Sequence, residues 1–186
     1  MIPLHDDNPT VITPVLTVTF IVTCVLVFVW QLSLGDDLER MVLALGAIPA
    51  TVVGGATLAP ELQLIPPWMT IFTSMFMHGG WMHIIGNMWF LWIFGGNVED
   101  AMGHRRFLLF YLLCGFAAAT AQMLANTSSP IPMVGASGAI GGVMGAYIVL
   151  YPRVHVHMLL FLGFYVTTFA VPAVFMLGYW ILLQLL

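Results

Sequence analysis

The sequence predicts an all-α membrane protein, a polytopic helix bundle with a long interfacial first loop. Of its 186 residues, 61% are hydrophobic and only 6% are charged, whereas soluble domains are about 25% charged. Several apolar stretches reach or approach the roughly 20 residues that cross a bilayer core of about 30 Å. The first ten residues are acidic and the apolar stretch after them is too long for a signal peptide, so no cleaved leader is expected.

Five transmembrane spans are predicted, all within one domain over residues 1–186. They cover about residues 11–31, 81–96, 107–126, 137–151 and the apolar segment from about Met158 to the end of the sequence. Pro14 lies in the opening turn of the first span, and Pro172 predicts a kink in the fifth. Residues 32–80 contain an amphipathic piece at 38–45, so this long connection is predicted to lie in the interface rather than to span.

The arginines predict the orientation. Arg105 and Arg106 lie between the second and third spans and Arg153 lies between the fourth and fifth, on the side of the N-terminus, while the other side has only Arg40. The positive-inside rule therefore predicts a cytoplasmic N-terminus. The formal charge of −4 gives no sign of nucleic-acid binding. Cys24 and Cys114 fall in apolar spans and are interpreted as packing residues.

The fourth span is too short to cross the membrane as a helix. Pro130, Pro132 and Gly135 break the helical pattern before Ser137, and Pro152 marks the other end. About fifteen helical residues remain, or roughly 22 Å at 1.5 Å each. Irregular backbone must supply the missing depth, which is tolerated only where protein buries it or water reaches it. Ser137 is therefore predicted at the start of a short helix, below the outer surface and beside a wet cavity.

His83 and Asn87 are predicted at the depth of Ser137. His83 and Ser137 each lie about 20 Å from the cytoplasmic ends of their helices, and Asn87 follows His83 on the same face. A helix N-terminus with histidine and asparagine donors nearby is the arrangement of an oxyanion hole for acyl transfer. Two plainer interpretations stay open. In the first, Ser137 serves only helix packing, as part of the small-residue patterns Gly138-x3-Gly142 and Gly141-x3-Gly145. In the second, His83 and Asn87 only form hydrogen bonds between helices.

The remaining histidines give no firm site, and no metal or cofactor is predicted. His78 lies about 140° around a helix from His83, which argues against a metal shared by the two. His155 and His157, in the predicted loop beside Arg153, are interpreted as a solvated or interfacial end, with metal binding as the alternative.

The chain resembles the rhomboid intramembrane serine proteases of bacteria over nearly its whole length. The motifs are Gly135-Ala-Ser-Gly138, His78-x4-His83-x3-Asn87, Phe94-Gly-Gly-x-x-Glu99, Gly145-Ala-Tyr147, Tyr151-Pro-Arg153 and Tyr179-Trp180. The resemblance implies hydrolysis of a peptide bond in or near a substrate's transmembrane segment. It implies that Ser137 is the nucleophile and that its N–H, His83 and Asn87 stabilise the oxyanion. The implied partners are transmembrane substrates and membrane lipid, with the fifth span as a mobile helix beside which substrate enters.

One family feature is missing from the sequence. The resemblance implies a catalytic histidine on a sixth, glycine-rich span, which the 186 residues do not contain. We therefore expect a C-terminally truncated chain that is inactive by itself. Two alternatives stay open. The first is a non-catalytic relative that binds transmembrane helices, and the second is a small transporter or channel with His78, His83 and Asn87 along its pathway.

Overall fold

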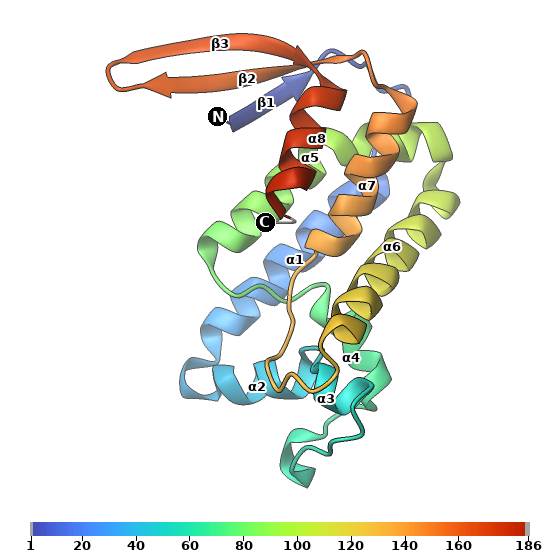
Figure 1. The fold of residues 1–186 in the computed structure, drawn as a ribbon, viewed down its shortest axis with the longest axis vertical. Coiled ribbons are helices and arrows are strands. Elements are labelled where there is room, and N and C mark those ends of the chain that lie inside the picture. Colours follow the sequence, from blue (N-terminus) through green and yellow to red (C-terminus); the bar gives the residue numbers. More distant parts are fainter. Residues whose placement is uncertain (1, 185–186) are drawn as a thin grey trace.

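A computed structural model describes residues 2–184 as a helical bundle with a small sheet at one end (Figure 1). In chain order the elements are β1 (Ile2–Asp6), α1 (Val15–Ser33), η1 (Gly35–Asp37), α2 (Leu38–Leu45), α3 (Pro49–Val52), η2 (Pro60–Leu62), η3 (Pro67–Met69), α4 (Thr70–Ser74), α5 (Trp81–Met102), α6 (His104–Ala125), α7 (Ser137–Leu150), β2 (His155–Leu162), β3 (Tyr165–Pro172) and α8 (Ala173–Gln184). The first four predicted spans correspond to α1, α5, α6 and α7.

Two of the described helices, α1 and α6, are long and apolar enough to cross a membrane. Helix α7 has only 14 residues, about 21 Å at 1.5 Å per residue. The predicted short fourth helix is therefore confirmed, with its start at Ser137. The count of five membrane spans stays a prediction.

Helix α7 packs against α5, α6 and α8, which places its first turn inside the bundle. Its close contact with α6 depends on two glycines. A Cβ added at Gly138 would lie 2.6 Å from Ala118 Cβ, and one added at Gly142 would lie 2.5 Å from Cys114 Cβ. Gly141 and Gly145 face open space instead. The pattern of Gly138 and Gly142 is thus a helix contact, whereas that of Gly141 and Gly145 is not.

The C-terminal part of α5 is joined to the start of α1 by a buried carboxylate. Glu99 accepts hydrogen bonds from the N–H groups of Leu16 and Thr17, each at 2.8 Å, and from the Thr17 hydroxyl. His104 Nδ1 lies 2.6 Å from the same carboxylate. A negative charge at the N-terminus of α1 is favourable because it satisfies main-chain donors that the helix leaves free.

The all-α prediction is wrong for residues 155–172. The sequence predicts a single helix from Met158 onward. The antiparallel hairpin of β2 and β3 takes the place of its first part, up to Pro172. Strand β1 adds to the other side of β2, so the sheet order is β1-β2-β3. In Figure 1 this sheet lies across the end of the bundle, and only α8 continues as a helix.

Local residue types explain the hairpin, although the apolar segment is long enough for a membrane helix. Aromatic and β-branched residues, which favour strands, flank the Gly163-Phe164 pair that joins β2 to β3. Gly163 has φ +64°, and glycine at the first position of a two-residue loop is typical of a type II′ turn. Pro172 ends β3 directly before α8, so the predicted proline kink inside a helix is also wrong.

The long first loop folds over the opposite end of the bundle from the sheet (Figure 1). Its amphipathic piece forms the helix α2, which covers Leu38–Leu45. The Thr73 hydroxyl donates to the Leu45 carbonyl at 2.6 Å. Ala47 pairs with Met133 through two main-chain hydrogen bonds. The loop thereby fixes the irregular segment that leads into Ser137.

Candidate functional site

Ser137 is the first residue of α7 and is partly buried. The first main-chain hydrogen bond there runs from the Ile140 N–H to the Ala136 carbonyl at 3.0 Å. The N–H groups of Ser137, Gly138 and Ala139 precede that bond, so they are available to a ligand at the helix N-terminus. The sequence therefore puts a hydroxyl beside several free main-chain donors.

Gly135 lets the chain turn into this helix against the His83 ring. Its φ of +125° is a conformation that side-chain-bearing residues rarely adopt. A Cβ at this position would lie 2.6 Å from His83 Nε2. The Gly135 N–H donates to the Ser74 carbonyl at 2.9 Å, which fixes the peptide two residues before the serine. Only glycine meets both requirements.

His83 directs one ring nitrogen toward Gly135. Its other nitrogen, Nδ1, lies 3.4 Å from the Gly79 N–H, which donates to it. A neutral imidazole that accepts at Nδ1 carries its proton on Nε2. We infer this tautomer from the Gly79 hydrogen bond. His83 then offers an Nε2–H donor beside the segment that leads to Ser137.

Asn87 supplies a second donor next to Gly135. The side chain is 9% exposed, and its Nδ2 has no hydrogen-bond partner within residues 2–184. Nδ2 lies 3.7 Å from the position of a Gly135 Cβ. Buried amide groups are almost always paired, so Nδ2 is a donor that remains available to a ligand beside Gly135.

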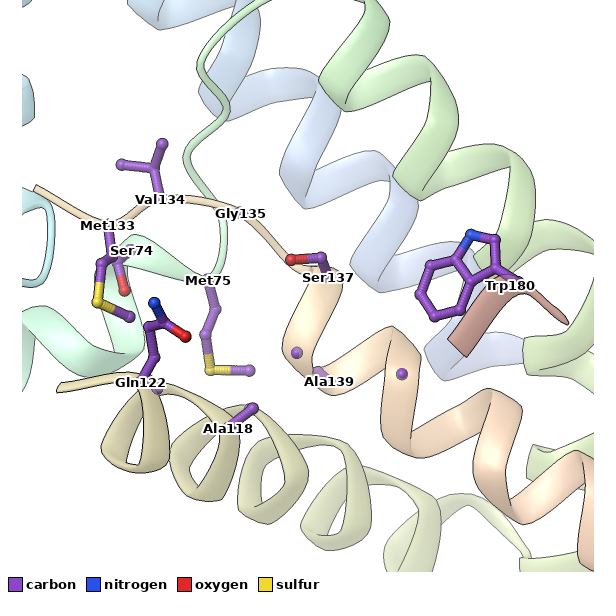
Figure 2. A pocket seen from close by; sticks show the side chains of 14 residues that line it. Ser74, Met75, Ala118, Gln122, Met133, Val134, Gly135, Ser137, Ala139 and Trp180 are labelled. Carbon is purple, nitrogen blue, oxygen red and sulfur yellow. The ribbon is translucent and has the colours of Figure 1, made fainter. Parts of the chain in front are cut away.

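An open cavity of about 510 Å³ adjoins Ser137. In Figure 2 its walls come from α7 with Ser137, from α6 with Ala118 and Gln122, from the end of α4 with Ser74 and Met75, and from the segment 133–135. Trp180 of α8 closes one side. All of the lining residues are uncharged. The cavity therefore suits a peptide segment without charged side chains near the serine.

Sequence reasoning missed several residues that shape this site. Gln31 of α1 brackets the main chain of His78: its amide donates to the His78 carbonyl at 3.2 Å and accepts from the His78 N–H at 3.0 Å. Gln122 and Trp180 line the cavity. A glutamine near the end of an apolar span was the only available signal for Gln31, because an intramembrane polar residue tends to have a specific partner.

The other histidines lie apart from this arrangement or beside it. The His78 ring makes an edge contact with His83, with centroids 5.2 Å apart, and it is not in the cavity lining. His155 and His157 belong to β2, which follows the far end of α7. They lie in a strand rather than in the predicted loop, with His155 exposed and His157 partly exposed.

Comparison with known proteins agrees with the predicted resemblance. The family model described as Rhomboid domain matches residues 66–186, which is more than half of the chain. The chain therefore belongs to the rhomboid family. This family is membrane-embedded, in agreement with the two apolar helices α1 and α6.

Several curated relatives share parts of this sequence. The "Rhomboid protease GluP" of Bacillus subtilis is 40% identical over 88 residues, which cover 46% of this chain and 17% of that protein. The "Putative rhomboid protease YdcA" of the same organism is 31% identical over 81 residues, covering 44% and 40%. "Rhomboid-like protein 11, chloroplastic" of Arabidopsis thaliana is 37% identical over 78 residues, covering 42% and 28%. The matched part is less than half of each of these relatives.

Proposed function

We propose that this rhomboid family member carries the nucleophile and oxyanion site of an intramembrane serine endopeptidase. The observation that carries the proposal is the convergence at Gly135 and Ser137. One hydroxyl begins a helix, and two side-chain donors, from His83 and Asn87, reach the glycine two residues before it. Relatives with related sequences are named as proteases.

In the proposed reaction, Ser137 Oγ attacks the carbonyl carbon of the scissile peptide bond. The carbonyl oxygen becomes negatively charged as the C–O bond to serine forms. The Ser137 N–H, His83 Nε2–H and Asn87 Nδ2–H donate to this oxyanion. Such donors act mainly on the transition state, and loss of one typically costs about 10²–10³ in rate.

The proton of Ser137 needs an acceptor that the cavity does not supply. Its lining residues include no histidine, aspartate or glutamate among the described part of the chain. His83 is committed to the oxyanion in this proposal, because its Nε2 carries a proton. We therefore propose that the general base is a histidine of the full-length protein outside these 186 residues, as the family resemblance implies.

The proposed substrate is a transmembrane segment of another protein. The uncharged cavity lies among helices of the bundle, and Trp180 of α8 forms part of its wall. A substrate backbone could approach Ser137 closely because Gly138 and Gly141 also line the cavity. We further propose a cytoplasmic N-terminus, from the arginine distribution, and a bacterial plasma membrane, from the family resemblance.

The test is proteolysis by the full-length protein in liposomes with a single-span substrate. Ser137→Ala is expected to abolish cleavage, because it removes the nucleophile while the helix start is kept. Ser33→Ala is the matched control: Ser33 is exposed at the end of α1 and its hydroxyl only donates to the Trp30 carbonyl. It should cleave like the unmodified protein.

Two outcomes would decide against the proposal. Equal cleavage by the full-length protein and Ser137→Ala would remove Ser137 as nucleophile. Crosslinking to transmembrane helices without cleavage, in protein that keeps its fold, would favour the helix-binding alternative.

A further inference from the structure

The outward face of the small sheet holds two histidines and an aspartate in direct contact. The rings of His5 and His157 stack with centroids 4.4 Å apart. His157 Nε2 lies 2.8 Å from Asp7 Oδ1. One nitrogen or oxygen atom from each of the three residues lies within 4.8 Å of the other two. None of these residues takes part in the proposed protease site.

Strand pairing holds the three side chains on one face. His5 of β1 pairs directly with His157 of β2, and the Asp7 N–H donates to the His155 carbonyl at 3.1 Å. Side chains alternate along a strand, so Asp6 and Val156 point the opposite way. Val156 is fully buried and Asp6 accepts a hydrogen bond from Tyr147 of α7. Because that inner face is packed on the bundle, the His5, Asp7 and His157 face is fixed outward.

The three donors suit a divalent transition metal. Two imidazoles and a carboxylate are ligands that Zn²⁺ accepts in tetrahedral sites, with bonds of about 2.0–2.2 Å. Donor atoms in such a site lie about 3.3 Å apart by that geometry. The present spacing of 2.8 Å to at most 4.8 Å needs only small side-chain rotations. The alternation of β2 places His155 on the same face, so it or water can complete the coordination.

The hydrogen bonds of the histidines are compatible with this role. His5 Nδ1 lies 3.2 Å from the Asp6 carbonyl, which favours a proton on Nδ1 and leaves a lone pair on Nε2. A main-chain carbonyl often orients a metal-binding histidine in this way. At His157 the ion would replace the hydrogen bond to Asp7. The ring proton would then reside on Nδ1, and Nε2 and Oδ1 would both bind the metal.

We propose that His5, Asp7 and His157 form a Zn²⁺ site. Its structural effect is a cross-link between the N-terminal strand β1 and the hairpin that leads into α8. The ligands come from positions about 150 residues apart, so the ion would stabilise the folded chain relative to the unfolded one. The proposal does not depend on protease activity.

The test is Zn²⁺ binding to the 186-residue chain in detergent micelles, purified with a tag that contains no histidine. After chelator treatment, the protein is titrated with Zn²⁺ against a chromogenic competitor. One equivalent should bind, with a saturable rise in the thermal midpoint. His5→Gln and His157→Gln should weaken binding by at least about tenfold, since even groups that only support a ligand contribute roughly 10–100-fold to metal affinity.

His104→Gln is the matched control, because His104 also contacts a carboxylate, that of Glu99, but has no second histidine beside it. It should bind Zn²⁺ like the unmodified chain. The shift of the thermal midpoint with Zn²⁺ is measured within each variant, so a change in basal stability does not obscure the result. Binding well below one equivalent, or an equal loss in His104→Gln and His157→Gln, would mean an adventitious ion only and would overturn the proposal.

Discussion

Two asparagines on α5 have opposite environments, although both are nearly inaccessible to solvent. Asn97 is fully engaged: it donates to Asp6 at 2.8 Å and accepts from Asn8 at 3.0 Å. Asn87 Nδ2, by contrast, has no partner within residues 2–184. The two hydrogen bonds of the Asn97 side chain explain its burial as a contribution to stability. For Asn87 a role with a ligand is the more economical explanation, since an unpaired buried amide costs free energy in the folded state.

This contrast predicts that Asn87→Ala separates activity from stability. The substitution should lower kcat of the full-length protein by about 10²–10³, the usual cost of losing one oxyanion donor. It should leave the free energy of unfolding unchanged or slightly increased, because Nδ2 makes no hydrogen bond within residues 2–184 that the substitution would remove. Proteolysis in liposomes measures the first quantity, and thermal unfolding in detergent measures the second.

Asn97→Ala is the paired control and should give the reverse pattern. Its loss leaves partners at Asp6 and Asn8 unsatisfied, so the free energy of unfolding should fall by about 1–3 kcal/mol. Cleavage per folded molecule should be unchanged. If Asn87→Ala instead destabilised the chain as much as Asn97→Ala and kept full activity, Asn87 would be structural.

Residue identity alone predicted part of this site. Gly135, Ser137, His83 and Asn87 were identifiable because polar or conformationally special residues are conspicuous in apolar spans. Trp180 was not identifiable as a cavity residue, since tryptophan is common in membrane proteins for packing and interfacial reasons. Its role depends on where α8 lies in the bundle, and no local pattern encodes that position.

Helix α7 is the element on which the site depends. Its glycines fall into two classes that the sequence does not distinguish. Those at 138 and 142 allow α6 to approach, while those at 141 and 145 face open space. A helix position of the first class tolerates no added methyl group, because the neighbouring atoms are already in contact. A position of the second class has room for one.

The prediction is that Gly142→Ala and Gly145→Ala have opposite effects on stability. Gly142→Ala places a Cβ 2.5 Å from Cys114 Cβ, and such overpacking typically costs about 1–3 kcal/mol. Gly145→Ala meets nothing within 4 Å, and should stabilise by roughly 0.5–1 kcal/mol because alanine restricts the unfolded chain and favours helix. Thermal unfolding of both variants in the same detergent measures the difference. Equal effects would show that α6 and α7 do not pack as described.

The hairpin of β2 and β3 is the element that the sequence pattern did not predict. Residues 155–172 are apolar enough for a membrane helix, and apolar content alone cannot separate a buried strand from a helix. The distinguishing signals were local: β-branched and aromatic residues on both sides of Gly163-Phe164. Pairing with β1 is a long-range contact between the two ends of the chain, and no local pattern predicts it.

At the scale of the whole molecule, the two ends of the bundle differ in character. One end carries the sheet, Glu99 and the first turn of α6 with Arg105 and Arg106. The other carries α2–α4 and the loop that enters α7. The depth comparison, which uses a rise of about 1.5 Å per residue in each helix, predicted that His83 and Ser137 lie at similar depth. In the structure His83 Nε2 lies beside Gly135, two residues before Ser137. The rise per residue gives relative depth only, and the prediction of which end faces the cytoplasm rests on the arginines alone.

The orientation leads to a labelling prediction. Thr10, before α1, and Ser128, between α6 and α7, are both exposed and lie at opposite ends of the bundle. In a Cys114→Ala background, Ser128→Cys should react with a membrane-impermeant maleimide in intact bacterial spheroplasts. Thr10→Cys should react only after lysis, because the three arginines at its end of the bundle favour retention in the cytoplasm. Cys24 is fully buried, so the background variant should stay unlabelled. Labelling of Thr10→Cys before lysis, with Ser128→Cys protected, would contradict the predicted orientation and would place the loop that enters α7 on the cytoplasmic side.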